Sequence, residues 1–130
     1  MTVYLSLAQL LRLHQLQVTA FGGPKMVQDA GRLEAAAARP RMTFAGEDLY
    51  PDLAAKAAAL MHSIVMNHPF VDGNKRVGAM AAELFLAVNG QALDSDDEAL
   101  IAIVVEVAAG RVTAEELAIW IRQRSGPIGE

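Results

Sequence analysis

Two helical patterns meet at the segment His68-Pro69-Phe70-Val71-Asp72-Gly73-Asn74-Lys75-Arg76. The pattern before this segment carries apolar residues at helical spacing and runs up to Pro69. The residue before a proline is pushed out of the α region, so the first helix should end there, with His68 at a bend just past it. The second helix should begin near Gly73. These nine residues, which we call the junction, therefore connect two helices.

The helix after the junction has the clearest pattern in the chain. Its apolar residues recur at i, i+3, i+4, i+7, i+8 and i+11, which is the stripe of an amphipathic helix. Asn89-Gly90 follows as a helix end. The helix before the junction has Pro51 suited to its first turn. The inward residues are Leu53, Ala57, Leu60, Met61, Ile64 and Val65 in the first helix, and Val77, Met80, Ala81, Leu84, Phe85 and Val88 in the second.

Further helix starts are marked by capping signatures on either side of this pair. Capping boxes are expected at Ser6–Gln9, Ser95–Glu98 and Thr113–Glu116, and Asp29 can cap a short helix that ends at Pro40. We therefore predict an all-α chain of about six helices. Its length of 130 residues favours one domain, residues 1–130.

Two segments do not fit the helical pattern. Arg41–Gly46 has β-type residues and a glycine turn, and we predict a short extended flap there, before the third long helix and beside the His68 bend. An ordinary connecting loop is the alternative. The tail after the last helix, residues 125–130, is expected to be disordered.

Composition excludes several classes of protein. Apolar residues make up 53% of the chain, which argues against disorder, and there is no cysteine for a disulfide or a thiolate metal site. The net charge of −4 argues against direct nucleic-acid binding, which needs a basic surface. No apolar run is long enough to cross a membrane, and the N-terminus does not resemble a signal peptide. We expect a soluble, cytoplasmic protein.

The junction carries the features of an anion site. A helix start presents free backbone amides and the positive end of the helix dipole, and Gly73 lets the backbone approach a ligand closely. Lys75 and Arg76 add two positive charges in the first turn, where they oppose the dipole, so their placement suggests a bound anion. Asn74 can donate to a phosphate oxygen through its amide.

Two junction residues have the chemistry for catalysis. Asp72 offers a hard oxygen ligand that could hold Mg²⁺ against phosphates, and His68 can act near neutral pH as a general base on an attacking hydroxyl. Phe70 most simply packs inward and fixes the loop. Each of these residues also has an ordinary structural interpretation. A histidine at a helix end is usually structural, an aspartate before a glycine usually forms a turn, and a Lys-Arg pair is usually a solvated face.

Taken together, these residues resemble the motif of the Fic/Doc superfamily, His-x-Phe-x-Asp/Glu-Gly-Asn-Gly-Arg-x-x-Arg. The chain matches it at His68, Phe70, Asp72, Gly73, Asn74 and Arg76. Lys75 replaces the second glycine and Ala79 the second arginine, and both departures are similar to the Doc (death-on-curing) branch. The likeness also includes Gly22-Gly23, Asp29-x-Gly31-Arg32 and the stretch from Leu84 to Gly90.

The resemblance implies a fold, a reaction and partners. The fold is a Fic/Doc-type helical bundle, and the reaction is transfer from ATP, with Mg²⁺, to a hydroxyl of a bacterial protein. Doc proteins act as kinases on a threonine of elongation factor Tu and so inhibit translation, and an antitoxin protein blocks their site. The flap at Met42, Thr43 and Phe44 would dock the target segment in an extended form.

Three other functions remain open at this point. The first is nucleotidyl (AMP) transfer to a protein hydroxyl, as in the wider Fic group; Lys75 and Ala79 favour the kinase instead. The second is a non-catalytic binding module whose pocket is a docking surface. The third is small-anion binding at the helix start alone, which predicts no dependence on Mg²⁺.

Overall fold

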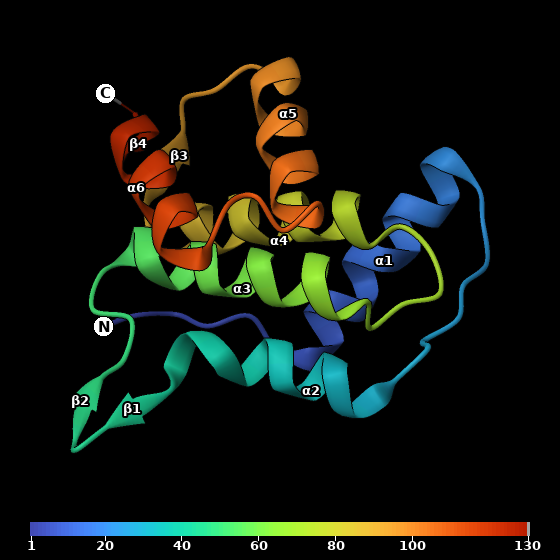
Figure 1. The fold of residues 1–130 in the computed structure, drawn as a ribbon, viewed down its shortest axis with the longest axis horizontal. Helices are drawn as coiled ribbons and strands as arrows, with labels where there is room; N and C mark the ends of the chain where they lie inside the picture. The colour runs from blue at the N-terminus through green and yellow to red at the C-terminus, as the bar shows by residue number, and fades with distance from the viewer. Residues whose placement is uncertain (130) are drawn as a thin grey trace.

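The computed structural model describes residues 1–129 and is mostly helical (Figure 1). Six α-helices, one short 3-10 helix and four short strands occur within this range, in agreement with the predicted all-α bundle. In chain order they are α1 (Leu7–Phe21), α2 (Ala30–Ala38), η1 (Arg39–Arg41), β1 (Thr43–Phe44), β2 (Glu47–Asp48), α3 (Leu53–Asn67), α4 (Asn74–Val88), β3 (Gln91–Leu93), α5 (Asp97–Ala108), α6 (Ala114–Arg124) and β4 (Ser125–Pro127).

The antiparallel pair α3 and α4 forms the centre of the molecule, with α1, α2, α5 and α6 packed around it (Figure 1). Ten of the 15 residues of α3 are buried, because other helices surround it on most sides. Gly78 of α4 explains how closely the pair approaches. A Cβ there would lie 2.7 Å from Val65 Cγ2 and 3.4 Å from the Met61 carbonyl oxygen. This glycine therefore serves helix packing.

Most helix starts follow the predicted capping chemistry. Full capping boxes form at Ser6 and Thr113, and Asp29 caps α2 through the amide of Arg32. Two details of the prediction were wrong. Asp96, not Ser95, caps α5, because its carboxylate accepts from the amide of Ala99. Asp52 caps α3 in the same way through Ala55, which leaves Pro51 just outside the helix.

The predicted flap is extended, but its expected position was wrong. Strands β1 and β2 form an antiparallel hairpin through Ala45 and Gly46, which both have positive φ, as a tight two-residue turn requires. The hairpin precedes the N-terminal end of α3, whereas His68 follows its C-terminal end (Figure 1). Since α3 has 15 residues, a helix about 22 Å long separates the hairpin from the junction.

The C-terminal segment also differs from expectation, because residues 125–129 are not a frayed tail. Ser125–Pro127 pairs with Gln91–Leu93 as an antiparallel strand, and the amide of Ile128 donates to the carbonyl of Gly90. These backbone bonds hold the segment although its one large apolar side chain, that of Ile128, is exposed. Glu130, the last residue of the predicted tail, lies outside the described residues. Among residues 1–129, no helix has both the length and the apolar content needed to cross a membrane.

Candidate active site

His68 forms the C-cap of α3, where the sequence predicted a bend. Its amide donates to the Ile64 carbonyl, and its φ and ψ of 49° and 61° lie in the left-handed region. This conformation costs a residue other than glycine about 1–3 kcal/mol, so surrounding contacts have to hold it. The side chain is exposed to solvent. His68 is therefore fixed in its backbone and open at its imidazole.

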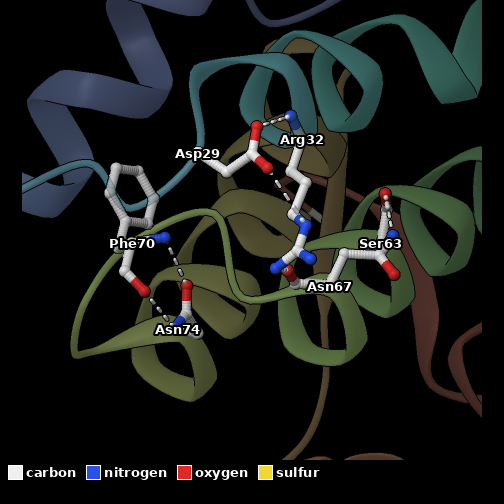
Figure 2. A network of polar contacts seen from close by, with 6 residues as sticks. All are labelled: Asp29, Arg32, Ser63, Asn67, Phe70 and Asn74. Atoms are coloured by element: carbon white, nitrogen blue, oxygen red, sulfur yellow. Dashed lines mark hydrogen bonds and ion pairs between the residues drawn. The ribbon is translucent and has the colours of Figure 1, made fainter.

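The loop after His68 is fixed by Phe70 and Asn74. Phe70 is fully buried, as predicted. The side-chain oxygen of Asn74 accepts from the backbone N–H of Phe70 at 3.0 Å, and its side-chain nitrogen donates to the Phe70 carbonyl at 2.9 Å (Figure 2). Asn74 is itself buried. The Asn74 side chain thus fixes the loop through both its oxygen and its nitrogen, and the phosphate contact of this side chain stays a prediction.

The start of α4 offers unpaired donors. Gly73 is the N-cap with φ of 85°, and no side chain caps the helix. Within residues 1–129, the backbone N–H groups of Asn74, Lys75 and Arg76 have no protein acceptor. The side chains of Lys75 and Arg76 are exposed, and the Arg76 guanidinium lies 4.0 Å from the centre of the Phe21 ring. Three amides and two cations therefore gather at one helix end, as predicted for an anion site.

A cavity of about 550 Å³ adjoins this helix end. Four junction residues line it, and most of its other lining side chains are apolar ones from α1, α4 and α5, including Phe21, Met80 and Ile101. The junction residues are Asp72, Gly73, Lys75 and Arg76. Ala79, at the position of the second motif arginine, also lines it. The volume is within the usual range for small-molecule sites.

Asp72 is the carboxylate of the junction. Its Oδ1 accepts from the Gly73 amide at 2.8 Å, and the side chain is exposed. In the described part of the chain, no three His, Asp or Glu residues gather as a ready-made metal site. Mg²⁺ is commonly held by one or two carboxylates together with substrate phosphates. The exposed Asp72 carboxylate beside the free amides of α4 fits that mode of binding.

Helix α1 packs against the junction and supports it through two side chains. This contact was not predicted from the sequence. The His14 ring stacks on Phe70 with a centroid distance of 3.9 Å, and its Nε2 lies 3.1 Å from the Asp72 carbonyl oxygen. Gln17 lies one turn further along and packs against Gly73, where a Cβ would come within 2.2 Å of the Gln17 Oε1. His14 lies on the helical pattern of α1, where a histidine is usually an ordinary core or surface residue. Two polar side chains on the buried face of α1 were the available signal.

The residues between α1 and α2 form an extended strip beside the junction. Val27 makes an isolated antiparallel bridge with Phe70, the Val71 amide donates to the Met26 carbonyl, and the Gln28 amide donates to the Pro69 carbonyl. This strip, residues 24–28, occupies the place expected for the flap. Met42, Thr43 and Phe44 belong instead to the distant hairpin, so the structure does not bring them to the site.

The other histidine of α3 does not share the setting of His68. His62 is half-buried, and Arg39 Nη1 lies 3.1 Å from its Nδ1. Burial, followed by the positive charge of Arg39, lowers the pKa of His62. Its ring is therefore engaged within the protein, whereas the exposed His68 ring is available to a substrate.

The fold and the site together define a helical protein with free amides and two cations at a helix start and a histidine beside it. Comparison with known proteins gives the same class: the model of the Fic/DOC family matches residues 4–86, from the segment before α1 through most of α4. The chain belongs to the Fic/Doc family.

Two relatives extend this comparison. The chain is 53% identical over 77 residues to the protein named Toxin Doc of Mycolicibacterium smegmatis, a match that covers 59% of this chain and 59% of that relative. It is 32% identical over 124 residues to Protein kinase doc of Escherichia phage P1, covering 95% of this chain and 96% of that relative. The match thus spans less than two thirds of the mycobacterial relative and nearly all of the phage protein.

Proposed function

We propose that this chain is a Doc-type toxin that transfers the γ-phosphate of ATP to a Thr or Ser hydroxyl of a bacterial protein. Elongation factor Tu is the target that the resemblance suggests, and inhibition of translation in the cytoplasm is the consequence. A separate antitoxin protein would block the site. The names of the two relatives, a toxin and a protein kinase, support this proposal.

The observation that carries the proposal is the helix start of α4. Its three unpaired amides and the side chains of Lys75 and Arg76 suit an anion with several oxygens, and the adjoining cavity has room for a nucleotide. Positioning and charge neutralisation are most of what phosphoryl transfer requires. Asp72 would hold Mg²⁺, which neutralises charge on the phosphates when bound.

His68 is proposed as the general base. It is not among the residues that line the cavity, and its ring is exposed on the protein surface. A hydroxyl on another protein can therefore approach the imidazole from outside while the nucleotide occupies the cavity. In that arrangement His68 accepts the hydroxyl proton, the oxygen attacks the terminal phosphorus, and the bond from this phosphorus to ADP breaks as ADP leaves.

Two residues favour the kinase over nucleotidyl transfer. Lys75 adds a charge in the first turn of α4, where the wider Fic motif has a glycine. Ala79 lines the cavity, where that motif has an arginine to hold distal phosphates. Without this second cation, the strongest anion site is the helix start itself, beside the His68 loop. The γ-phosphate is the group we place there.

The target segment is proposed to dock on the strip of residues 24–28. Val27 is bridged to Phe70 by the bonds of its neighbours, and within residues 1–129 its own N–H and C=O have no partner. An extended peptide could add to this free edge by backbone hydrogen bonds. The strip lies directly beside the loop that carries His68, so a docked hydroxyl would be close to the base.

The test is transfer of label from ATP to the proteins of a bacterial lysate in the presence of Mg²⁺. Label from γ-labelled ATP should appear on a protein, label from α-labelled ATP should not, and the His68→Ala variant should transfer neither. His62→Ala is the matched control, because it removes the other histidine of the same helix. Transfer of the α-label would replace the kinase by a nucleotidyl transferase. Undiminished toxicity of His68→Ala in bacteria would favour the non-catalytic binding module.

A further inference from the structure

We infer that Arg32, held by Asp29, is a positioning residue that aims His68. This inference rests on the proposed role of His68 but concerns a different part of the chain, at the start of α2. His68 is one of two residues other than glycine with positive φ within residues 1–129. Its unusual backbone therefore needs restraints on both sides, and the polar contacts of Figure 2 supply them.

The peptide plane before His68 is held at both of its polar atoms. Arg32 Nη1 donates to the Asn67 carbonyl oxygen at 3.1 Å (Figure 2). The N–H of the same plane, that of His68, donates to the Ile64 carbonyl at 3.3 Å. Without the arginine, the Asn67 carbonyl would face solvent at the end of α3, where helices usually fray.

The backbone after His68 is also held. Pro69 has one torsion fixed by its ring, and its carbonyl accepts from the amides of Gln28 at 2.8 Å and Asp29 at 3.1 Å. The next amide, that of Phe70, donates to Asn74. His68 therefore lies between two restrained peptide planes, the one that precedes it and the one between Pro69 and Phe70. Arg32 restrains the first plane, and the Asp29 amide restrains the second.

Arg32 itself is oriented by Asp29. The Asp29 Oδ1 accepts from the Arg32 amide at 3.1 Å, and its Oδ2 lies 3.4 Å from the Arg32 Nε (Figure 2). One carboxylate thus caps α2 and fixes the guanidinium that reaches Asn67. A guanidinium fork can contact both partners, whereas a lysine ammonium is a single point of charge.

This pair lies at the surface, which separates its positioning role from a structural one. The Arg32 and Asp29 side chains keep 50% and 45% of their exposure, so the ion pair between them contributes little to global stability. Loss of the Arg32 contact should release the Asn67–His68 plane and let the imidazole sample other directions. Substrate binding at α4 should be nearly unaffected, because Arg32 does not line the cavity.

The test compares Arg32→Ala, Arg32→Lys and the control Arg12→Ala. Arg12 is an exposed arginine whose side chain, among residues 1–129, bonds only to Gln15 of the same helix. In Arg32→Ala we expect kcat for phosphoryl transfer to fall about 10- to 100-fold, as for a misaligned catalytic group. The KM for ATP should change by less than about threefold. Free guanidinium ion should restore part of the kcat of Arg32→Ala. The kcat of Arg32→Lys should recover less than half of the parent value. Arg12→Ala should match the parent.

A second readout does not depend on activity. In NMR spectra of labelled protein, the His68 backbone resonances should shift or broaden in Arg32→Ala and stay unchanged in Arg12→Ala. Unchanged His68 resonances in Arg32→Ala would overturn the inference, and so would a loss of activity that only follows a lower melting temperature. If the parent itself transfers no phosphate, the proposed function fails while the NMR comparison still decides the role of Arg32.

Discussion

The imidazole of His14 lies flat on the ring of Phe70, with 3.9 Å between the ring centroids and 7° between the planes. The same imidazole reaches the Asp72 carbonyl oxygen through Nε2. Because a carbonyl oxygen can only accept, Nε2 carries the hydrogen of this bond. One side chain of α1 therefore contacts the junction at its buried aromatic residue and at the residue proposed to hold Mg²⁺.

Two substitutions at His14 should separate stacking from hydrogen bonding. His14→Phe keeps an aromatic ring against Phe70 but removes the donor to Asp72, so we expect a loss of about 1 kcal/mol in unfolding free energy and slower phosphoryl transfer. His14→Gln keeps a donor and loses the stack, so its loss of stability should be larger. Urea unfolding and the label-transfer assay measure both effects. Full activity in His14→Phe would show that the hydrogen bond does not position the junction.

Gly73→Ala should abolish most activity for two separable reasons. The added Cβ would lie 2.2 Å from the Gln17 Oε1, and the residue would keep an unfavourable φ of 85°. We expect a cost of about 1–3 kcal/mol in stability. Adding Gln17→Ala removes the clash and leaves the backbone strain, so the double variant should regain only part of the stability. Complete recovery would mean that the backbone adopts this conformation without strain.

Loosening the β1–β2 hairpin should leave phosphoryl transfer unaffected. Lys56 of α3 is almost fully buried and donates to Asp48 Oδ2 at 3.0 Å and to the Tyr50 carbonyl. Lys56→Met should speed hydrogen exchange in residues 43–48 while phosphoryl transfer stays near the parent rate. Asp48→Ala should lower the free energy of unfolding by more than Lys56→Met does, by about 1–3 kcal/mol, because it leaves the buried Lys56 ammonium with one partner. If Lys56→Met abolished transfer, the hairpin would have a role at the site.

Stability should depend on pH through Asp52. The hydrogen bond from Arg122 to this carboxylate, with its amide and charge contacts, outweighs burial and lowers the pKa of Asp52. A lowered pKa contributes stability above the unfolded value, near 4, and this contribution is lost as the pH falls through the folded value. Asp52→Asn keeps a side chain that can cap the helix. At pH 7 its free energy of unfolding should be lower than that of the parent by about 0.5–1 kcal/mol, as for a partly exposed ion pair. The loss should vanish in acid melts, and a loss that persisted there would exclude this pair as its source.

The junction was predictable because its chemistry is local. Pro69 ends α3, Gly73 begins α4, and the cations beside the helix start depend on neighbours within a few residues. The supports of the junction were not predictable in the same way. His14 and Gln17 act on residues more than fifty positions away, and their role depends on how α1 crosses the loop. Polar residues on the buried face of α1 hinted only that some contact exists.

Dependence on distant parts of the chain also explains where the structure differs from the predictions. The extended character of Thr43–Asp48 follows from its own residues, but its distance from His68 is set by the 15 residues of α3. The strip of residues 24–28 has no regular alternation, and its pairing with the junction appears only after α1 and α2 have packed. Ser125–Pro127 is likewise ordered by Gln91–Leu93, a partner some thirty residues away in the chain.

The placement of the hairpin at the far end of α3 has a practical and an evolutionary consequence. Its turn at Ala45 and Gly46 is exposed, and the 15 residues of α3 separate the hairpin from the junction. Residues inserted there, such as an epitope or a fluorescent reporter, would leave the chemistry undisturbed. Lineages can likewise remodel this tip, and so acquire new surfaces for recognition, while the junction stays under a separate constraint.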